Sequence, residues 1–243
     1  MRDKLERLAL ETRQRTYSYL LCALILYLVV IPFLPGLTRF AWIDDYLLVL
    51  VLFASLYNIA GHRGHLIVGL VLGFPAVASR LATAHIGVVP VVPATLTALS
   101  VFAFLLYLIF RVMKDVLSGR RLTRERIVGA IVAYLLIGLQ WSLIYGFIEH
   151  VHPGSFSIPD EMLALGDVRP SAIPVSIFGY FSFVTLATLG YGDVTPISAA
   201  ARTFAWFEAI GGQLFVAVTI ARLVGIQVAE SAESPRDRGA IND

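Results

Sequence analysis

Long apolar runs alternate with short polar segments along the chain, and the lengths of these runs predict how it folds. A helix that crosses a bilayer needs roughly 20 mostly apolar residues. A run at 174–187 is too short to cross, and we expect it to enter the membrane and return as a half-helix. The pattern predicts an all-α membrane protein with one re-entrant helix and six transmembrane helices, at about 17–35, 43–60, 66–84, 93–113, 127–148 and 199–224.

The composition agrees with a chain that lies mostly in lipid. Apolar residues make up 58% of the sequence, and the mean hydropathy is +0.78. Only 15% of the residues are charged, against about 25% in ordinary globular chains. The formal net charge is +2, and no basic patch is interleaved with aromatic residues, so nucleic acid is not an expected partner.

The distribution of basic residues sets the expected orientation in the membrane. Cytoplasmic segments of membrane proteins carry an excess of Lys and Arg. With the N-terminus inside, six crossings place most of the 19 basic residues in cytoplasmic segments and leave Arg39, Arg80, Arg169 and Arg202 outside. Both termini are therefore predicted to be cytoplasmic, in a multi-pass protein of the cell membrane. Arginine greatly outnumbers lysine, which favours a bacterial inner membrane.

The runs and the charges also divide the chain into parts. A cytoplasmic amphipathic segment at 1–15 precedes an expected four-helix membrane domain at 16–113. A second membrane unit at 127–226 ends in a short, polar cytoplasmic tail at 227–243, which we expect to be disordered. The second unit contains an outer helix, the half-helix at 174–187, a glycine-rich stretch at 188–192 and a return helix at 199–224.

A basic linker at 114–126 joins the two membrane units. Val112, Val116 and Leu117 share one helical face, which suggests a helix lying along the inner membrane surface. Two interpretations of its arginines stay open. They attract anionic lipid headgroups, or they are solvated as in any cytoplasmic loop.

The stretch Thr188-Leu189-Gly190-Tyr191-Gly192, called the glycine segment below, has the composition of a polar path through the membrane. Non-helical backbone at membrane depth is tolerated where it lines such a path. Consecutive carbonyls point to one side when right- and left-handed backbone angles alternate, and glycine reaches the left-handed region without steric cost. Stacked rings of carbonyls, with the Thr188 hydroxyl as a further ring, replace the water around a dehydrated cation. The negative C-terminal end of the half-helix favours the same charge.

The residues next to these carbonyls have expected places of their own. The Tyr191 side chain alternates to the other side, so it should face away from the path and pack against the half-helix. Asp193 ends the stretch at the outer mouth. Pro196 is suited to the start of the return helix.

The run SIFGYFSFVTLATLGYGDVTP resembles the pore helix and selectivity filter of the potassium channels, whose filters have glycine-tyrosine-glycine after a threonine. The resemblance covers about 127–226. It implies a homotetramer around a central pore, with K+ held at Thr188, Leu189, Gly190 and Tyr191. It implies no cofactor other than K+ ions and no enzymatic activity.

Several residues depart from the pattern of that family or add to it. Leu189 replaces the usual valine, but its contribution to the path is a carbonyl, so conduction should survive. Tyr180 and Phe181 stand where many members have tryptophans and can still brace the filter. Glu208 on the return helix is costly at membrane depth. It is expected either to hydrogen-bond behind the filter or simply to be satisfied among protein neighbours.

The return helix contains two further candidate features. Gly211 and Gly212 stand near its middle, where potassium channels often carry a hinge glycine. Val216, Ile220 and Val224 share one helical face below them. That spacing fits a hydrophobic gate, which closes by dewetting, and it equally fits ordinary helix packing.

The leading hypothesis is thus a potassium-selective channel with passive flux. A weakly selective monovalent cation channel is an alternative, because an imperfect filter can carry the same glycine pattern. A cation transporter subunit is a less favoured alternative. Transporters are built from repeats with broken helices in matching halves, and residues 1–125 contain no second re-entrant loop.

We expect this channel to show little voltage dependence of its own. Voltage-sensing helices carry an arginine series inside the membrane, whereas the run at 93–110 has no charge, and Arg111 and Lys114 lie only at its cytoplasmic end. Open probability measured against voltage in planar bilayers should change only shallowly. An opening curve that requires several gating charges would contradict this prediction.

Overall fold

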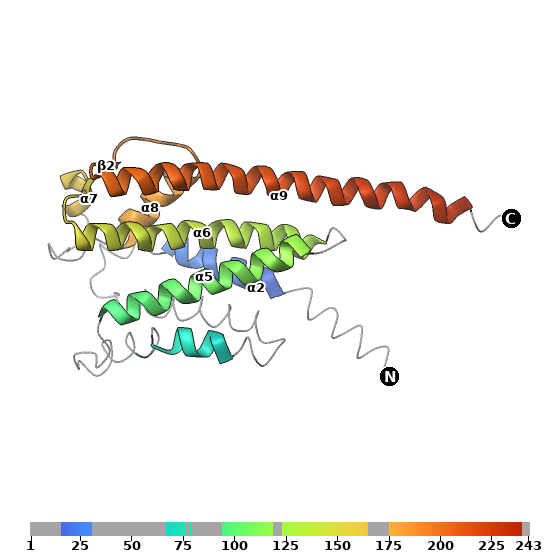
Figure 1. Cartoon of the computed structure of the whole chain (residues 1–243), viewed down its shortest axis with the longest axis horizontal. Helices are drawn as coiled ribbons and strands as arrows, with labels where there is room; N and C mark the ends of the chain where they lie inside the picture. The colour runs from blue at the N-terminus through green and yellow to red at the C-terminus, as the bar shows by residue number, and fades with distance from the viewer. Residues whose placement is uncertain are drawn as a thin grey trace.

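The computed structural model describes residues 16–30, 67–75, 78, 94–118, 123–164 and 175–239. This part of the chain is mostly helical, with one short antiparallel ladder (Figure 1). Residues 67–75 are helical. The other elements are α2 (Thr16–Val30), α5 (Ala94–Ser118), α6 (Arg124–Val151), β1 (Phe156–Ser157), α7 (Asp160–Ala164), α8 (Val175–Leu186), β2 (Thr195–Pro196) and α9 (Ala199–Gly239).

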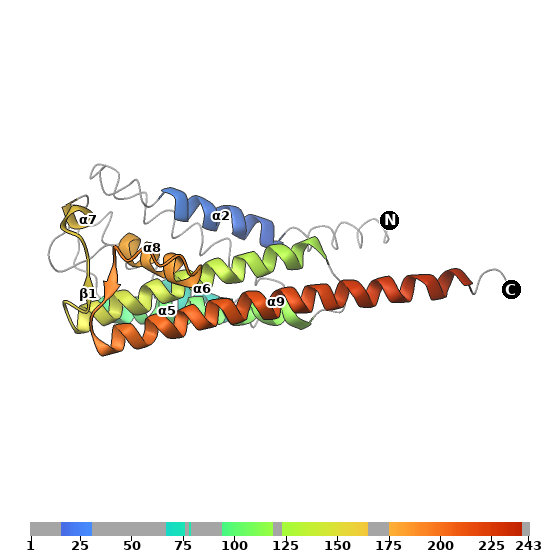
Figure 2. The ribbon, with the colours of Figure 1, turned by 90° about the horizontal axis from the view of Figure 1, so that it is seen from above.

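Helix α6 is the element on which the others are arranged. It contacts α2, α5, α8 and α9. α2 lies on the opposite side of α6 from α9, as two perpendicular views show (Figures 1 and 2). The central place of α6 agrees with its burial, because half of its most apolar stretch is covered by other parts of the protein (50%).

Both ends of α6 are set by local chemistry. Thr123 precedes the helix in an extended conformation, and Glu125 places a carboxylate in the positive first turn. At the other end, Glu149 accepts backbone N–H groups from Gly154 (2.7 Å) and Phe156 (3.2 Å). Gly154 has a φ of +83°, which a residue with a Cβ rarely adopts. This turn sends the chain back along α6 into β1.

A polar junction joins α2 and α5 to the start of α6. The Tyr17 hydroxyl donates to Asp115 of α5 at 2.8 Å, and the Tyr17 backbone N–H donates to Glu125 of α6 at 3.1 Å. The Ser18 hydroxyl donates to the same carboxylate at 3.1 Å. Gly129 keeps the helices close here, because a Cβ at that position would lie 3.0 Å from a methyl group of Val116. This junction connects the first membrane unit to the second.

The expected linker is shorter than the sequence suggested. α5 continues to Ser118 and α6 begins at Arg124, so much of the region 114–126 is helical. Val112 and Val116 are almost fully buried in a core cluster shared with α2 and α6. The prediction that their face lies on the inner membrane surface was therefore wrong, because the face has protein neighbours.

α9 also differs from the prediction at both ends. It begins at Ala199, after Ser198, whose hydroxyl accepts the Ala201 N–H at 3.1 Å. Pro196, expected to start the helix, instead pairs with Phe156 in the β1–β2 ladder. The helix continues to Gly239, so the tail expected to be disordered is helical for most of its length. Extending an existing helix costs little compared with starting one.

Two described helices are long and apolar enough to cross a membrane, Arg124–Val151 and Ala199–Ala229. The first apolar run is helical over Thr16–Val30, the third over 67–75 and the fourth over Ala94–Ser118. The segment at 1–15 and the second run at 43–60 lie outside the described residues. The six crossings thus remain a prediction.

Candidate functional site

The glycine segment leaves α8 through a defined helix end. The Thr188 N–H donates to the Thr185 carbonyl at 2.9 Å, and the Leu189 N–H donates to the Val184 carbonyl at 2.8 Å. This pair of bonds is the Schellman motif, which requires a left-handed residue just after the helix. That residue is Thr188, with a φ of +57°.

Left-handed backbone recurs at every second residue of the glycine segment. Thr188, Gly190 and Gly192 have φ values of +57°, +59° and +78°. Thr188 is the only non-glycine residue with positive φ in the described part of the chain. A residue with a Cβ usually pays roughly 1–2 kcal/mol in this region, and a glycine at position 188 would avoid that cost. The sequence identified Gly190 and Gly192 but gave no signal that Thr188 adopts the same backbone.

The side chains of the glycine segment are largely uncovered within one chain. Leu189 is 55% exposed and Tyr191 is 66% exposed. The packing of Tyr191 against the half-helix is therefore mostly absent inside this chain.

Tyr180 and Asp193 join α8 to the outer end of the glycine segment. The Tyr180 hydroxyl donates to the Asp193 carboxylate at 2.5 Å. This bond lowers the pKa of Asp193. Because the pKa of Asp193 is lowered in the folded protein, the bond is present at neutral pH. It is lost only as the pH falls through that lowered pKa.

Phe181 faces the other way, into an aromatic cluster. Its ring meets those of Tyr145 (4.9 Å between centroids) and Phe156 (5.4 Å) edge to face, and Phe156 also meets Phe178 at 5.1 Å. Edge-to-face contacts of this kind are favourable beyond the area they cover. Phe156 thus anchors the outer loop between α6 and α8.

The same outer loop is also hydrogen-bonded to the chain beyond the glycine segment. Phe156 pairs with Pro196 and Ser157 with Thr195. The Ser155 carbonyl accepts the Ile197 N–H at 2.7 Å. The exit of the glycine segment is therefore tied to the end of α6, a link that the sequence analysis did not anticipate.

Glu208 lies fully buried where α9 meets α8 and α6. The Ser182 hydroxyl of α8 lies 2.5 Å from Glu208 Oε1, and the Tyr145 hydroxyl of α6 contacts Glu208 Oε2. Ser182 Oγ also lies 2.8 Å from the Gly138 carbonyl of α6. Glu208 thus contacts the middle of α8 and does not reach the glycine segment itself.

Gly138 lets α8 lie directly against α6. A Cβ at Gly138 would fall 2.4 Å from a ring carbon of Phe183, well inside van der Waals contact. The ring therefore occupies the space that any larger residue would need. Gly138 was not singled out in the sequence, because one glycine inside an apolar helix carries no local signal.

The two glycines near the middle of α9 have different surroundings. A Cβ at Gly212 would lie 2.8 Å from the carbonyl oxygen of Leu186, the last residue of α8. A Cβ at Gly211 would meet nothing within 4 Å. α9 runs through both as one helix. Gly212 is thus a close-packing position under α8, while Gly211 has no such role inside the chain.

The rest of α9 is mostly uncovered. Only 11% of its most apolar stretch is buried inside the chain, on the face that meets α8 and α6. Val216, Ile220 and Val224 are exposed, as are larger apolar side chains including Phe204, Trp206, Phe207, Ile210 and Leu214. A water-soluble protein rarely leaves so much apolar surface uncovered.

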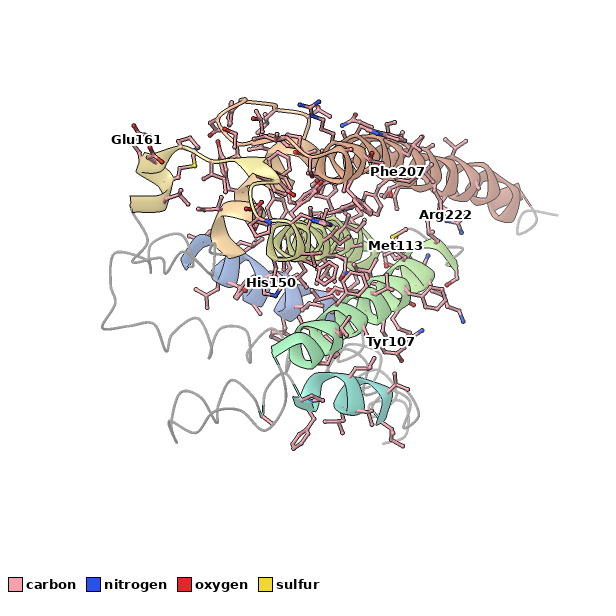
Figure 3. The ribbon with its side chains drawn as sticks, turned by 60° about the vertical axis from the view of Figure 1, so that its left-hand side comes forward. Tyr107, Met113, His150, Glu161, Phe207 and Arg222 are labelled. Atoms are coloured by element: carbon pink, nitrogen blue, oxygen red, sulfur yellow. The ribbon has the colours of Figure 1, made fainter. Side chains whose placement is uncertain are left out.

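Charged residues occur at well-separated positions in the described structure. Glu161 belongs to α7, at the end of the described structure where α9 begins, and Arg222 lies further along α9 (Figure 3). The β1–β2 ladder lies at this end, near α7 (Figure 2), and the sequence predicts that this end is outside.

Comparison with known proteins bears on the same region. Residues 174–227 match a protein family described as "Ion channel". Over 58 residues the chain is 45% identical to the "Inward rectifier potassium channel Kirbac3.1" of Paramagnetospirillum magnetotacticum. This segment is therefore similar to ion channels, among them a prokaryotic potassium channel. No solved structure matches the chain.

The match to Kirbac3.1 covers 23% of this chain and 20% of that protein, so the chain spans about a fifth of its relative. The family match begins beside α8, includes the glycine segment and ends within α9. α2, α5 and α6 lie outside the family match.

Gly212→Ala should destabilise the protein by about 1–3 kcal/mol, the usual cost of overpacking. Its methyl group would press on the Leu186 carbonyl, and the glycine segment begins just after Leu186. Thermal unfolding of the purified protein and cation currents in bilayers measure the two effects, and both should fall.

Gly211→Ala is the matched control. Its methyl group meets nothing, and alanine is favoured over glycine in a helix by about 0.5–1 kcal/mol, so stability should be unchanged or higher. Equal effects of the two substitutions on thermal unfolding would show that the contact with Leu186 is unimportant.

Proposed function

We propose that the protein is a homotetrameric channel that conducts K+ passively across a bacterial inner membrane, with both termini in the cytoplasm. The glycine segment of each chain forms one quarter of the selectivity filter. K+ binds between rings contributed by Thr188, Leu189, Gly190 and Tyr191, and no other cofactor is needed. In this proposal K+ is the ion that the channel transports, and it is not a resident cofactor.

The alternation of left-handed backbone at Thr188, Gly190 and Gly192 carries the proposal. This alternation turns successive carbonyls to one side, which is the arrangement that replaces the hydration shell of a cation. Thr188 adopts it despite its side chain, which adds a hydroxyl at the inner end of the path. The Schellman end of α8 accounts for the left-handed Thr188, whereas the repeat of left-handed backbone at Gly190 and Gly192 goes beyond what a helix end requires.

The uncovered surfaces support assembly into a ring. One glycine segment cannot close a ring of carbonyls, and Tyr191 lacks most of its cover in the single chain. The exposed apolar face of α9 would pack against neighbouring chains or lipid. Val216, Ile220 and Val224 would then line the inner cavity as a hydrophobic gate, with Gly211 as a hinge above them.

The electrostatic features of the site favour a cation. The C-terminal end of α8, with its partial negative charge, leads directly into the glycine segment. Asp193 adds a carboxylate at the outer mouth, which the Tyr180 hydroxyl keeps ionised at neutral pH. The basic residues of the segment 114–126 would bind anionic lipid headgroups.

The test is the reversal potential of the purified protein in planar bilayers, with K+ on one side and Na+ on the other. A value near the potassium equilibrium potential is expected. A value near zero with clear currents would favour a weakly selective monovalent cation channel. Flux that requires a second solute gradient would favour a transporter subunit.

Gly190→Ala should abolish K+-selective current. A Cβ at Gly190 meets no neighbouring atom, so the substitution acts only through the backbone, whose φ of +59° disfavours alanine. Alanine turns the Gly190 carbonyl away from the path.

Leu189→Val is the matched control, because Leu189 contributes a carbonyl and its side chain is largely exposed in the protomer. Its selectivity should stay close to that of the unmodified protein. Selective current in Gly190→Ala would contradict the assignment of the glycine segment as the filter.

A further inference from the structure

The contacts around Glu208 form a continuous chain of oxygen atoms. It runs from the Tyr145 hydroxyl to the Glu208 carboxyl, then to the Ser182 hydroxyl and the Gly138 carbonyl. The chain connects α6 to α9, α9 to α8, and α8 back to α6. Glu208 and Ser182 are both fully buried.

Counting protons along this chain decides the state of Glu208. Three close oxygen–oxygen contacts need three protons if each is a hydrogen bond. Tyr145 and Ser182 carry one hydroxyl proton each, and the Gly138 carbonyl carries none. The third proton must therefore belong to Glu208. Glu208 then donates to Ser182, Ser182 donates to Gly138, and Tyr145 donates to Glu208.

The ionised form would leave this arrangement one proton short. Ser182 would have to donate to the carboxylate, and its oxygen would then face the Gly138 carbonyl at 2.8 Å without a proton between them. In the described residues, no lysine, arginine or histidine forms an ion pair with Glu208, and the hydroxyls of Tyr145 and Ser182 are its hydrogen-bond partners. A buried charge without a partner of opposite sign is strongly unfavourable.

We propose that Glu208 is a neutral carboxylic acid at neutral pH, and that its proton locks the pore helix α8 against α6 and α9. Loss of the proton breaks the link between Ser182 and Gly138 and loosens α8. Because Ser182 lies on the helix that leads into the glycine segment, alkaline pH should disorder the filter. This last step rests on the proposed channel function.

The titratable neighbours of Glu208 in the described structure are tyrosines of α6. Tyr145 is a direct hydrogen-bond partner, and Tyr134 lies close enough to sense the charge of Glu208. α8 brings only the Ser182 hydroxyl to the carboxyl, and Arg202 of α9 instead bonds the Pro196 carbonyl at 3.2 Å. A pH response of the lock therefore has Glu208 as its source.

The protonation state can be measured without any ion current. Infrared spectra of the full-length protein in lipid vesicles at neutral pH should show a protonated-carboxyl C=O band that Glu208→Gln lacks. Glu149→Gln is the matched control, because the Glu149 carboxylate accepts two backbone N–H groups and should not contribute to that band. If Glu208→Gln and the unmodified protein gave the same band at neutral pH, the proposal would be overturned.

The effect on the filter is measured as K+ current and K+-over-Na+ selectivity in bilayers between pH 6 and pH 10, a span on the order of that over which shifted carboxyl groups titrate. The unmodified protein should lose selective current reversibly at the alkaline end. Glu208→Gln should keep it at every pH, because an amide donates to Ser182 and accepts from Tyr145 as the neutral acid does.

Ser182→Ala breaks the hydrogen-bond chain and should weaken selective current at every pH. A pH response that persists in Glu208→Gln would overturn the proposal that the Glu208 proton holds α8 in place. If no protein carries current at any pH, the channel proposal fails, while the infrared band still decides the state of Glu208.

Discussion

The attachment of α8 to α6 is the constraint on which the rest of the site depends. α8 has only 12 residues, too few to form a stable helix without tertiary support. The Phe183 ring fills the space above Gly138, the Ser182 hydroxyl reaches the Gly138 carbonyl, and Phe181 packs on Tyr145. Since the glycine segment starts at the last turn of α8, these contacts fix where its carbonyls begin.

Further contacts fix the other end of the glycine segment and the helix beneath it. Asp193 is bonded to Tyr180, and the residues that follow pair with the outer loop that Phe156 anchors. Gly212 brings α9 against the end of α8. The segment is therefore held at its entry, at its exit and from behind, while its own side chains stay uncovered within the chain. In the proposed tetramer, neighbouring chains would cover these side chains.

Much of this arrangement could be predicted from the sequence. The features that could not be predicted have identifiable physical causes. Apolar run lengths gave the extents of α6 and α8, and the glycine pattern gave the left-handed positions at Gly190 and Gly192. Ser182 and Gly138 stand 44 positions apart, so no local pattern reports their contact. The sequence suggested a surface linker and a disordered tail where the structure has helix. At the linker, the valines pack against α2 and α6, and the tail continues a helix that has already formed.

The central claim is that glycine segments from several chains form binding sites for dehydrated K+. Thermal unfolding of the purified assembly in K+ and in Na+ at equal ionic strength tests it most directly, because an ion that binds only the folded state raises its stability. K+ should raise the unfolding temperature above its value in Na+, and Gly190→Ala should remove the difference. Equal unfolding temperatures in the two salts would contradict the account.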